Sequence, residues 1–198
     1  MLHTSTTPDT TDAVRAGTWA LLGRLLLAPP DDEVRERLVA VTASDVSDPL
    51  HAAWSALAQA TREAEPRALR EEYQDVFIGV GGGEVTPYAS WYLTGALLDR
   101  PLVELREELA ALGIERGGNA REPEDHAGTI CETMTFAILD DDVDFEWQKD
   151  FFERYVDSWM ERLFEDLGRA SSARYYRSVG ALGTAFLHIE RRYYAMAA

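Results

Sequence analysis

Apolar residues recur every three or four positions through most of the chain, which is the spacing of one face of an α-helix. The segment from about Asp12 to Ala28, DAVRAGTWALLGRLLLA, carries a broad apolar face and ends before Pro29 and Pro30. Alternating apolar and polar runs bounded by turn residues, which would indicate β-strands, do not stand out anywhere in the sequence. The pattern therefore predicts an all-α fold.

Acidic residues and prolines mark where the next helices begin. Asp31 or Asp32 can cap the segment EVRERLVAV, because a short carboxylate side chain accepts hydrogen bonds from the first free N–H groups of a helix. Asp48 followed by Pro49 opens LHAAWSALAQATREA in the same way, and Pro66 opens RALREEYQDVFIG.

A glycine-rich segment interrupts this series between residues 79 and 83. Four glycines in five positions disfavour a helix, since each costs about 1 kcal/mol relative to alanine. The segment lacks the lysine and hydroxyl of a phosphate-binding loop and follows no predicted strand. A flexible connector is therefore favoured, and nucleotide binding, which a GTP titration would test, is a weaker alternative.

Helical patterns continue after the glycines. The segment YASWYLTGALL, residues 88–98, is predicted to be helical, and Pro101 opens a helix that ends at Gly113. A helix is predicted from Pro123 to about Leu139, and two or three more from Phe145 onward. Two buried stripes at helical spacing are predicted at Leu102, Leu105, Leu109 and Leu112, and at Ala127, Ile130, Met134 and Ile138.

These segments predict one domain, a helical bundle of about eight to ten helices over residues 13–198. The first residues, 1–12, lack apolar periodicity and are predicted to form a flexible tail. The apolar fraction of 46% and aromatic fraction of 10% are typical of a globular protein.

Charge narrows the classes of partner. Nineteen basic and 35 acidic residues give a formal net charge of −16, which disfavours nucleic acid and anionic lipid and favours cationic partners. The single cysteine, Cys131, excludes an intramolecular disulfide and fits a reducing compartment. No segment resembles a secretory signal peptide or the roughly 20 apolar residues of a membrane span, so a cytoplasmic protein is expected.

The motif EPEDH, residues 122–126, is the cluster of ionisable groups of greatest interest. Pro123 suits the first position of a helix, Glu122 can cap it, and Glu124 and Asp125 place negative charge near the positive end of the helix dipole, worth about 0.3 to 1 kcal/mol each. Capping does not explain His126, whose imidazole can pair with Asp125 or donate to a carbonyl. From these residues alone, EPEDH can be either a helix start or a functional site, and both interpretations stay open.

Metal binding and nucleophilic catalysis have weaker support. The four histidines, His3, His51, His126 and His188, are far apart, and no pair has the i,i+4 spacing of a helical zinc site. Cys131 falls within a predicted helix and has no recognisable nucleophile motif around it. Neither a metal nor another cofactor is expected.

Aromatic residues flank the glycine segment on both sides. Tyr73 and Phe77 lie one helical turn apart just before it, and Tyr88, Trp91 and Tyr92 follow it. Such residues usually belong to the core. Aromatic side chains beside a flexible loop are also typical of a groove that binds a peptide.

Taken in order, these motifs resemble one known family. YxxxF (Tyr73–Phe77), the glycine segment, PYASWY (Pro87–Tyr92), LGI (Leu112–Ile114) and EPEDH followed by Met134 resemble the TorD/DmsD/NarJ family of redox enzyme maturation chaperones, most closely its DmsD-like branch. The resemblance covers about Trp19 to Tyr194. The chain departs from the family pattern at four positions, which leaves the branch and the client open: Tyr88, Ile130, Cys131 and Thr133.

The resemblance implies a TorD-like all-helical chaperone without catalytic activity. Such a protein binds the twin-arginine signal peptide and the body of a molybdopterin oxidoreductase catalytic subunit, and delays export until the cofactor is inserted. Whether it is a monomer or a domain-swapped dimer stays open. The candidate peptide-binding residues, to which we add the neighbouring Trp91 and Glu122, are Tyr73, Val76, Phe77, Pro87, Tyr88, Ser90, Trp91, Glu122, Asp125 and His126.

The expected mode of binding places an apolar peptide segment in a groove lined by Phe77 and Tyr88. Asp125 would then pair with an arginine or amide, and His126 would hold that carboxylate. Two alternatives are a permanent small subunit of a redox complex and a hydrolytic enzyme using the Glu122, Asp125 and His126 cluster.

Overall fold

The computed structural model describes residues 10–41, 47–79, 81–114 and 122–196. Within these ranges every regular element is a helix, which confirms the all-α prediction of about eight to ten helices. The α-helices and the two short π-helical segments, η1 and η2, are α1 (Thr10–Leu27), α2 (Asp32–Val39), α3 (Pro49–Glu63), α4 (Pro66–Tyr73), η1 (Gln74–Ile78), α5 (Ala89–Thr94), α6 (Arg100–Ala111), α7 (Ala127–Leu139), α8 (Phe145–Phe151), η2 (Phe152–Asp157), α9 (Met160–Arg169) and α10 (Tyr175–Met196).

Helix α1 begins earlier than its apolar pattern indicates. Residues 10–12, predicted to belong to the tail, form its first turn. The rest of the predicted tail lies outside the described residues. Arg15 in the next turn donates to Asp12, which gives the early start a local reason.

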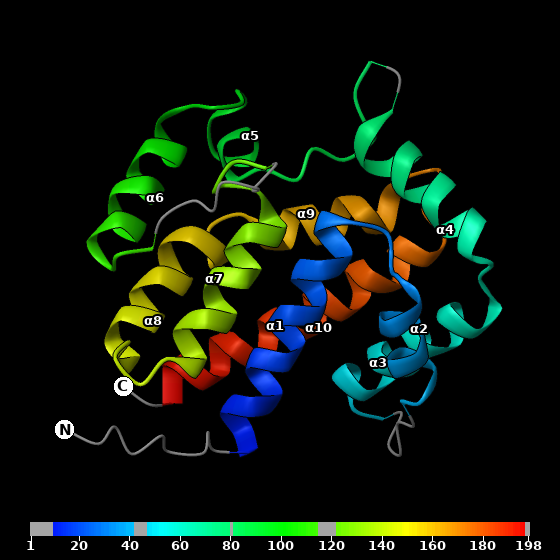
Figure 1. Ribbon diagram of the computed structural model, residues 1–198, viewed down its shortest axis with the longest axis horizontal. Coiled ribbons are helices and arrows are strands. Elements are labelled where there is room, and N and C mark those ends of the chain that lie inside the picture. Colours follow the sequence, from blue (N-terminus) through cyan, green and yellow to red (C-terminus); the bar gives the residue numbers. More distant parts are fainter. Residues whose placement is uncertain (1–9, 42–46, 80, 115–121, 197–198) are drawn as a thin grey trace.

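Helices α1, α7 and α10 form the centre of the molecule, and α2, α3 and α4 lie on one side of them (Figure 1). Helices α1 and α7 approach closely at two glycines. A Cβ atom on Gly128 would lie 2.5 Å from the Cγ atom of Leu27, and one on Gly23 would lie 3.1 Å from the carbonyl oxygen of Gly128. The crossing therefore depends on the absence of side chains at both positions.

A buried ion pair joins α1 to α10. The Arg15 guanidinium donates to both carboxylate oxygens of Glu190, at 2.7 and 3.0 Å, and the Trp19 indole donates to the same carboxylate at 3.0 Å. Arg15 also donates to the Tyr194 hydroxyl at 2.7 Å. Every charge of this network has a partner, as a buried charge requires if it is not to be strongly destabilising.

The predicted helix starts at Asp31 and Asp48 are confirmed. The Asp31 carboxylate accepts from the Val34 N–H at 2.9 Å, and that of Asp48 from the N–H groups of Leu50 and His51 at 2.9 and 3.0 Å. These bonds satisfy donors that the first turn of a helix leaves free.

Helix α5 ends at Thr94 rather than at the predicted residue 98. Gly95 follows with a φ of 78°, and Leu98 has a φ of 57°, so the backbone leaves the helical region twice within four residues. Gly113, with a φ of 73°, ends the next helix as predicted.

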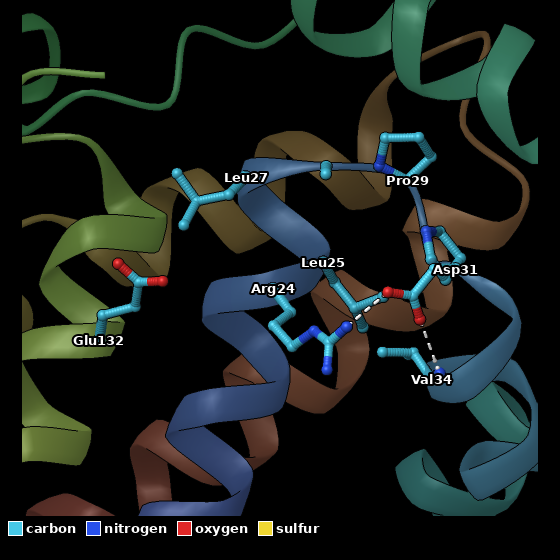
Figure 2. A pocket seen from close by; sticks show the side chains of 9 residues that line it. Arg24, Leu25, Leu27, Pro29, Asp31, Val34 and Glu132 are labelled. Atoms are coloured by element: carbon cyan, nitrogen blue, oxygen red, sulfur yellow. Dashed lines mark hydrogen bonds and ion pairs between the residues drawn. The ribbon is translucent and has the colours of Figure 1, made fainter. Parts of the chain in front are cut away.

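A small pocket of ≈ 200 Å³ lies where α1 turns into α2 (Figure 2). Its acidic group Asp31 already accepts from Arg24 and caps α2, and Glu132 of α7 lines the opposite side. The pocket therefore belongs to the architecture of this turn. Among the described residues, each helix is too short or too polar to cross a lipid bilayer.

Candidate functional site

The two motifs that carry the resemblance, PYASWY and EPEDH, lie side by side. The Ala89 N–H donates to the Asp125 carbonyl at 2.9 Å, and the Ala127 N–H donates to the Pro87 carbonyl at 2.8 Å. Tyr88 and His126 face each other across this short antiparallel pairing. Two segments separated by more than thirty positions in the sequence thus lie side by side.

Asp125 holds the beginning of α5 from a distant segment. Its Oδ2 atom accepts from the backbone N–H of Ser90 at 3.1 Å and also from the Ser90 hydroxyl. Asp125 is 1% exposed and Ser90 is fully buried. Within the described part of the chain, the Asp125 Oδ1 atom has no hydrogen-bond partner, so this buried carboxylate keeps one free acceptor.

The predicted start of α7 at Pro123 is wrong. The helix begins at Ala127, and His126 is its N-cap, with Nδ1 accepting from the Gly128 N–H at 3.0 Å. Pro123 instead lies in a turn, where its carbonyl accepts from the His126 N–H at 3.1 Å. The pairing with residues 87–89 holds the backbone at His126 extended, with a φ of −66° and a ψ of 135°, and so delays the helix.

The capping role expected for Glu122 is therefore wrong as well. The Tyr88 hydroxyl donates to the Glu122 carboxylate at 2.6 Å, and Glu124 pairs with Arg106 of α6 at 2.8 Å. Both carboxylates bind side chains of other segments instead of the first turn of α7. Burial, followed by the bond to Glu122, raises the pKa of Tyr88, so its hydroxyl stays protonated and acts as the donor.

His126 does not hold the Asp125 carboxylate, contrary to expectation, because Ser90 performs that task. The imidazole is 3% exposed, and burial lowers its pKa to about 4 although Glu122 and Asp125 oppose this shift. A neutral ring also agrees with Nδ1 accepting a hydrogen bond, which a protonated nitrogen cannot do. The ring packs edge-to-face against Tyr88, with centroids 5.0 Å apart.

Two further candidate residues, Val76 and Phe77, belong to the core, and Tyr73 packs against it. Tyr73 and Phe77 pack against each other and against Tyr176 of α10, with neighbouring ring centroids 5.0 to 5.9 Å apart, and Val76 is fully buried. Burial, with Glu122 as a second cause, raises the pKa of Tyr73 to about 12, which indicates that Tyr73 lies within electrostatic reach of the EPEDH motif. Phe77 is 8% exposed, so its ring is part of the core rather than an open groove wall.

The glycine segment is fastened on both sides. The Val85 N–H donates to the Val76 carbonyl at 2.9 Å, and a Cβ atom on Gly83 would lie 2.4 Å from the backbone carbon of Phe77. Glu84 accepts from Ser171 and Ser172 in the connection between α9 and α10, and their hydrogen bonds lower its pKa to about 2.

Glu72 of α4 binds the chain at the beginning of α10. Its carboxylate accepts from the N–H groups of Arg174 and Tyr176 at 2.7 and 2.8 Å. The roles of Glu72 and Glu84 are not predictable from the sequence, because nothing near an isolated acidic residue marks the distant N–H groups that it binds.

The candidate residues therefore divide into an accessible and a buried group. Trp91 is 46% exposed, and Tyr88 and Glu122 are half-buried. Tyr73 is also half-buried, and the buried group consists of Val76, Phe77, Pro87, Ser90, Asp125 and His126. In the part of the chain that the structure describes, no three His, Cys, Asp or Glu residues lie close enough together to hold a metal ion.

Comparison with known proteins gives consistent results. Residues 43–165 match the family described as nitrate reductase delta subunit. Chaperone protein TorD of Vibrio parahaemolyticus is 25% identical over 136 residues, 63% of this chain and 63% of that protein. Chaperone protein TorD of Vibrio atlanticus is 25% identical over 146 residues, 68% of each chain. The chain thus matches less than two thirds of the length of the first of these relatives.

The fold also matches a solved structure. A crystal structure described as a redox enzyme maturation protein from Archaeoglobus fulgidus aligns with 96% of this chain and 99% of its own, with a TM-score of 0.58 and 15% sequence identity. At this identity the likeness shows a shared fold.

Proposed function

Since the chain belongs to the nitrate reductase delta subunit family, which its residues 43–165 match over more than half of its length, we propose that it is a cytoplasmic maturation chaperone without catalytic activity. It binds the twin-arginine signal peptide and the body of a molybdopterin oxidoreductase catalytic subunit. Binding assists cofactor insertion and delays export until maturation is complete.

The observation that carries this proposal is the joining of PYASWY and EPEDH into one site by the pairing of residues 87–89 with 125–127. Two kinds of comparison support it: the Vibrio relatives are named chaperones, and the Archaeoglobus structure is described as a redox enzyme maturation protein. The −16 charge suits a ligand that carries two arginines.

The arrangement of the site gives each group a role in peptide binding. Trp91 and the ring of Tyr88 offer apolar surface, and the Glu122 carboxylate offers a charged partner for an arginine. Asp125, Ser90 and His126 act as positioning residues, because the bond between Asp125 and Ser90 joins the two segments and His126 caps α7. The free Oδ1 acceptor of Asp125 can take a donor from the peptide if α5 shifts.

Glu122→Gln tests the charged contact. Removing one partly exposed carboxylate is expected to weaken binding of the client's signal peptide by about tenfold, measured by calorimetry, because a charge-assisted contact becomes a neutral one. The signal peptides of the host's molybdopterin oxidoreductases, synthesised one by one, are the probes. Glu124→Gln is the matched control, since that carboxylate belongs to the same loop but pairs with Arg106.

Equal losses in the two variants would show a general charge effect and contradict the assignment of Glu122. Absence of binding by the unaltered chain to every such peptide, with no molybdoenzyme recovered on it from host extract, would contradict the proposed function itself.

The family description, delta subunit, favours one alternative, a permanent small subunit. A permanent subunit would co-purify in a fixed ratio with the mature, cofactor-loaded enzyme, whereas a chaperone would be found only with the immature form. The hydrolytic alternative has less support, because Asp125 binds Ser90 and His126 Nδ1 binds Gly128, so the carboxylate does not orient the imidazole as a general base requires.

A further inference from the structure

Another pocket, of ≈ 480 Å³, lies between the first turn of α3 and the second half of α10. Its apolar lining consists of Pro49, Leu50, Ala185 and Ile189, and its polar lining of Asp48, His188, Arg191 and Arg192. The volume falls within the roughly 300 to 1,000 Å³ of sites that bind small molecules. No candidate peptide-binding residue lines this pocket, so it is distinct from the site at EPEDH.

The walls of the pocket offer apolar contact surface. Leu50, Ala185 and Ile189 are half-buried, so part of each side chain remains open to solvent. Ala185 and Ile189 lie one turn apart on the same face of α10. Because the side chain of Ala185 is a single methyl group, it leaves space beside Ile189 that a larger side chain would fill. An aliphatic group bound in this space would be stabilised by removing apolar surface from water.

Two of the three basic side chains that line the pocket already have acidic partners. Arg191 donates to Asp157 of η2 and, at 2.7 Å, to Glu161 of α9. The His188 Nε2 atom lies 3.1 Å from the other oxygen of the Glu161 carboxylate. Arg191 and His188 therefore bind α10 to its neighbours, and neither leaves an uncompensated positive charge in the pocket.

Arg192 is the third basic side chain, and its charge is available to a ligand. It is exposed, and it makes no hydrogen bond or ion pair with any residue that the structure describes. This is so although acidic residues outnumber basic ones in the chain, 35 to 19. A guanidinium in this state can donate two parallel hydrogen bonds to a carboxylate. The pocket therefore combines an apolar wall with one free cation.

We propose that this pocket binds a small monoanion with an apolar body, of the class of medium-chain carboxylates. The carboxylate pairs with Arg192, and the aliphatic chain packs on Leu50 and Ile189. One free guanidinium suits a single negative charge. A second charge on the ligand would be repelled by Asp48 in the lining and by the −16 charge of the chain. The proposal stands whether or not the proposed function holds.

The test uses the full chain and octanoate as the probe, with binding measured by calorimetry. Octylammonium has the same apolar chain with the opposite charge, octyl phosphate carries a second negative charge, and acetate lacks the apolar body. Arg192→Gln removes the free cation. Its matched control is Arg174→Gln, because the Arg174 side chain is also exposed and also has no partner among the described residues.

A second pair of variants tests the apolar wall. Ala185→Leu fills the pocket, whereas Ala181→Leu adds the same side chain one turn earlier on α10, at an exposed position outside the lining. Urea unfolding establishes that both variants fold before binding is measured. The arginine pair tests the proposal by itself if Ala185→Leu does not fold.

Octanoate is expected to bind the unaltered chain more tightly than acetate, octylammonium or octyl phosphate. Arg192→Gln should weaken octanoate binding by about tenfold, because a charge-assisted contact is lost, and Arg174→Gln by less than about twofold. Ala185→Leu should weaken it more than Ala181→Leu. Equal effects of the two arginine variants, no binding of octanoate by the unaltered chain, or tighter binding of octylammonium or octyl phosphate would overturn the proposal.

Discussion

At the scale of single residues, EPEDH separates into side chains that hold the site and side chains that face outward. Asp125 fixes α5 through Ser90, and His126 caps α7 through Gly128, so the buried pair positions two helices. Glu122 remains half-buried beside Tyr88. Substitutions in this motif therefore need a readout that separates folding from binding.

His126→Asn provides one such readout. An unfolded histidine gains its proton as the pH falls through 6.5, whereas burial delays this in the folded chain to a pKa of about 4. The stability that neutral His126 contributes is thus present above pH 6.5 and is lost as the pH falls toward 4, by up to about 3 kcal/mol.

Asparagine retains an acceptor for the Gly128 N–H and cannot be protonated in this range. The variant should therefore unfold in denaturant with a smaller loss of stability between pH 6.5 and 4 than the unaltered chain. Identical profiles for the variant and the unaltered chain would show that His126 is not held neutral by burial.

At the scale of elements, local signals predict helix starts well where the cap belongs to the same helix. The helix starts predicted at Asp31 and Asp48 are correct, because each side chain accepts from N–H groups two or three positions ahead. Pro123 has the same local appearance, yet the hydrogen bonds of Ala89 and Ala127 to a distant segment postpone the helix to Ala127. The pairing of residues 87–89 with 125–127 is a tertiary contact, and a short stretch of sequence does not reveal it.

The candidate site shows the same division between local and distant information. The resemblance places Tyr88, Asp125 and His126 in one region, and the structure joins them, whereas the burial of Phe77 and the partner of Asp125 follow only from packing. The π-helical turns η1 and η2 were also not predicted, because their hydrogen-bond pattern leaves the apolar period of a short segment nearly unchanged.

The close crossing of α1 and α7 requires glycine at position 128. Gly128→Ala is expected to destabilise the fold by about 1 to 3 kcal/mol, because its methyl group would meet Leu27 in a closely packed interface. Gly17→Ala in α1, where a Cβ atom has nothing within 4 Å, should instead stabilise by about 0.5 to 1 kcal/mol. Urea unfolding of both variants measures the difference, and destabilisation of similar size at both positions would argue against a specific crossing.

At the scale of the whole molecule, an apolar centre is surrounded by a strongly acidic surface. In the core, Arg15 and Glu190 form an ion pair between α1 and α10, and Asp125 is held by hydrogen bonds from Ser90. Acidic side chains outnumber basic ones, 35 to 19. Folding brings these charges closer together, so their repulsion lowers the stability of the folded chain. The same excess favours a cationic partner at the proposed peptide-binding site.

Thermal unfolding should consequently depend on salt. Raising sodium chloride from low ionic strength to about 0.15 M shortens the screening length to about 8 Å, so the melting temperature is expected to rise as repulsion weakens. Near pH 4.6, the pI calculated from the sequence, the net charge is close to zero and the same addition should have little effect. A melting temperature that falls with salt at neutral pH would show that attractive surface pairs outweigh the repulsion.

The fastening of the glycine segment has a practical and an evolutionary consequence. Its tip, at Gly81 and Gly82, has open space around it and φ values of 96° and 117°, while Val85 and Glu84 hold the returning chain in place. Lengthening a loop whose ends are already fixed costs only about 0.6 kcal/mol for each doubling of its length. The tip is therefore the place where related proteins can gain or lose residues without altering the helices, and where a fluorophore or an epitope tag can be introduced.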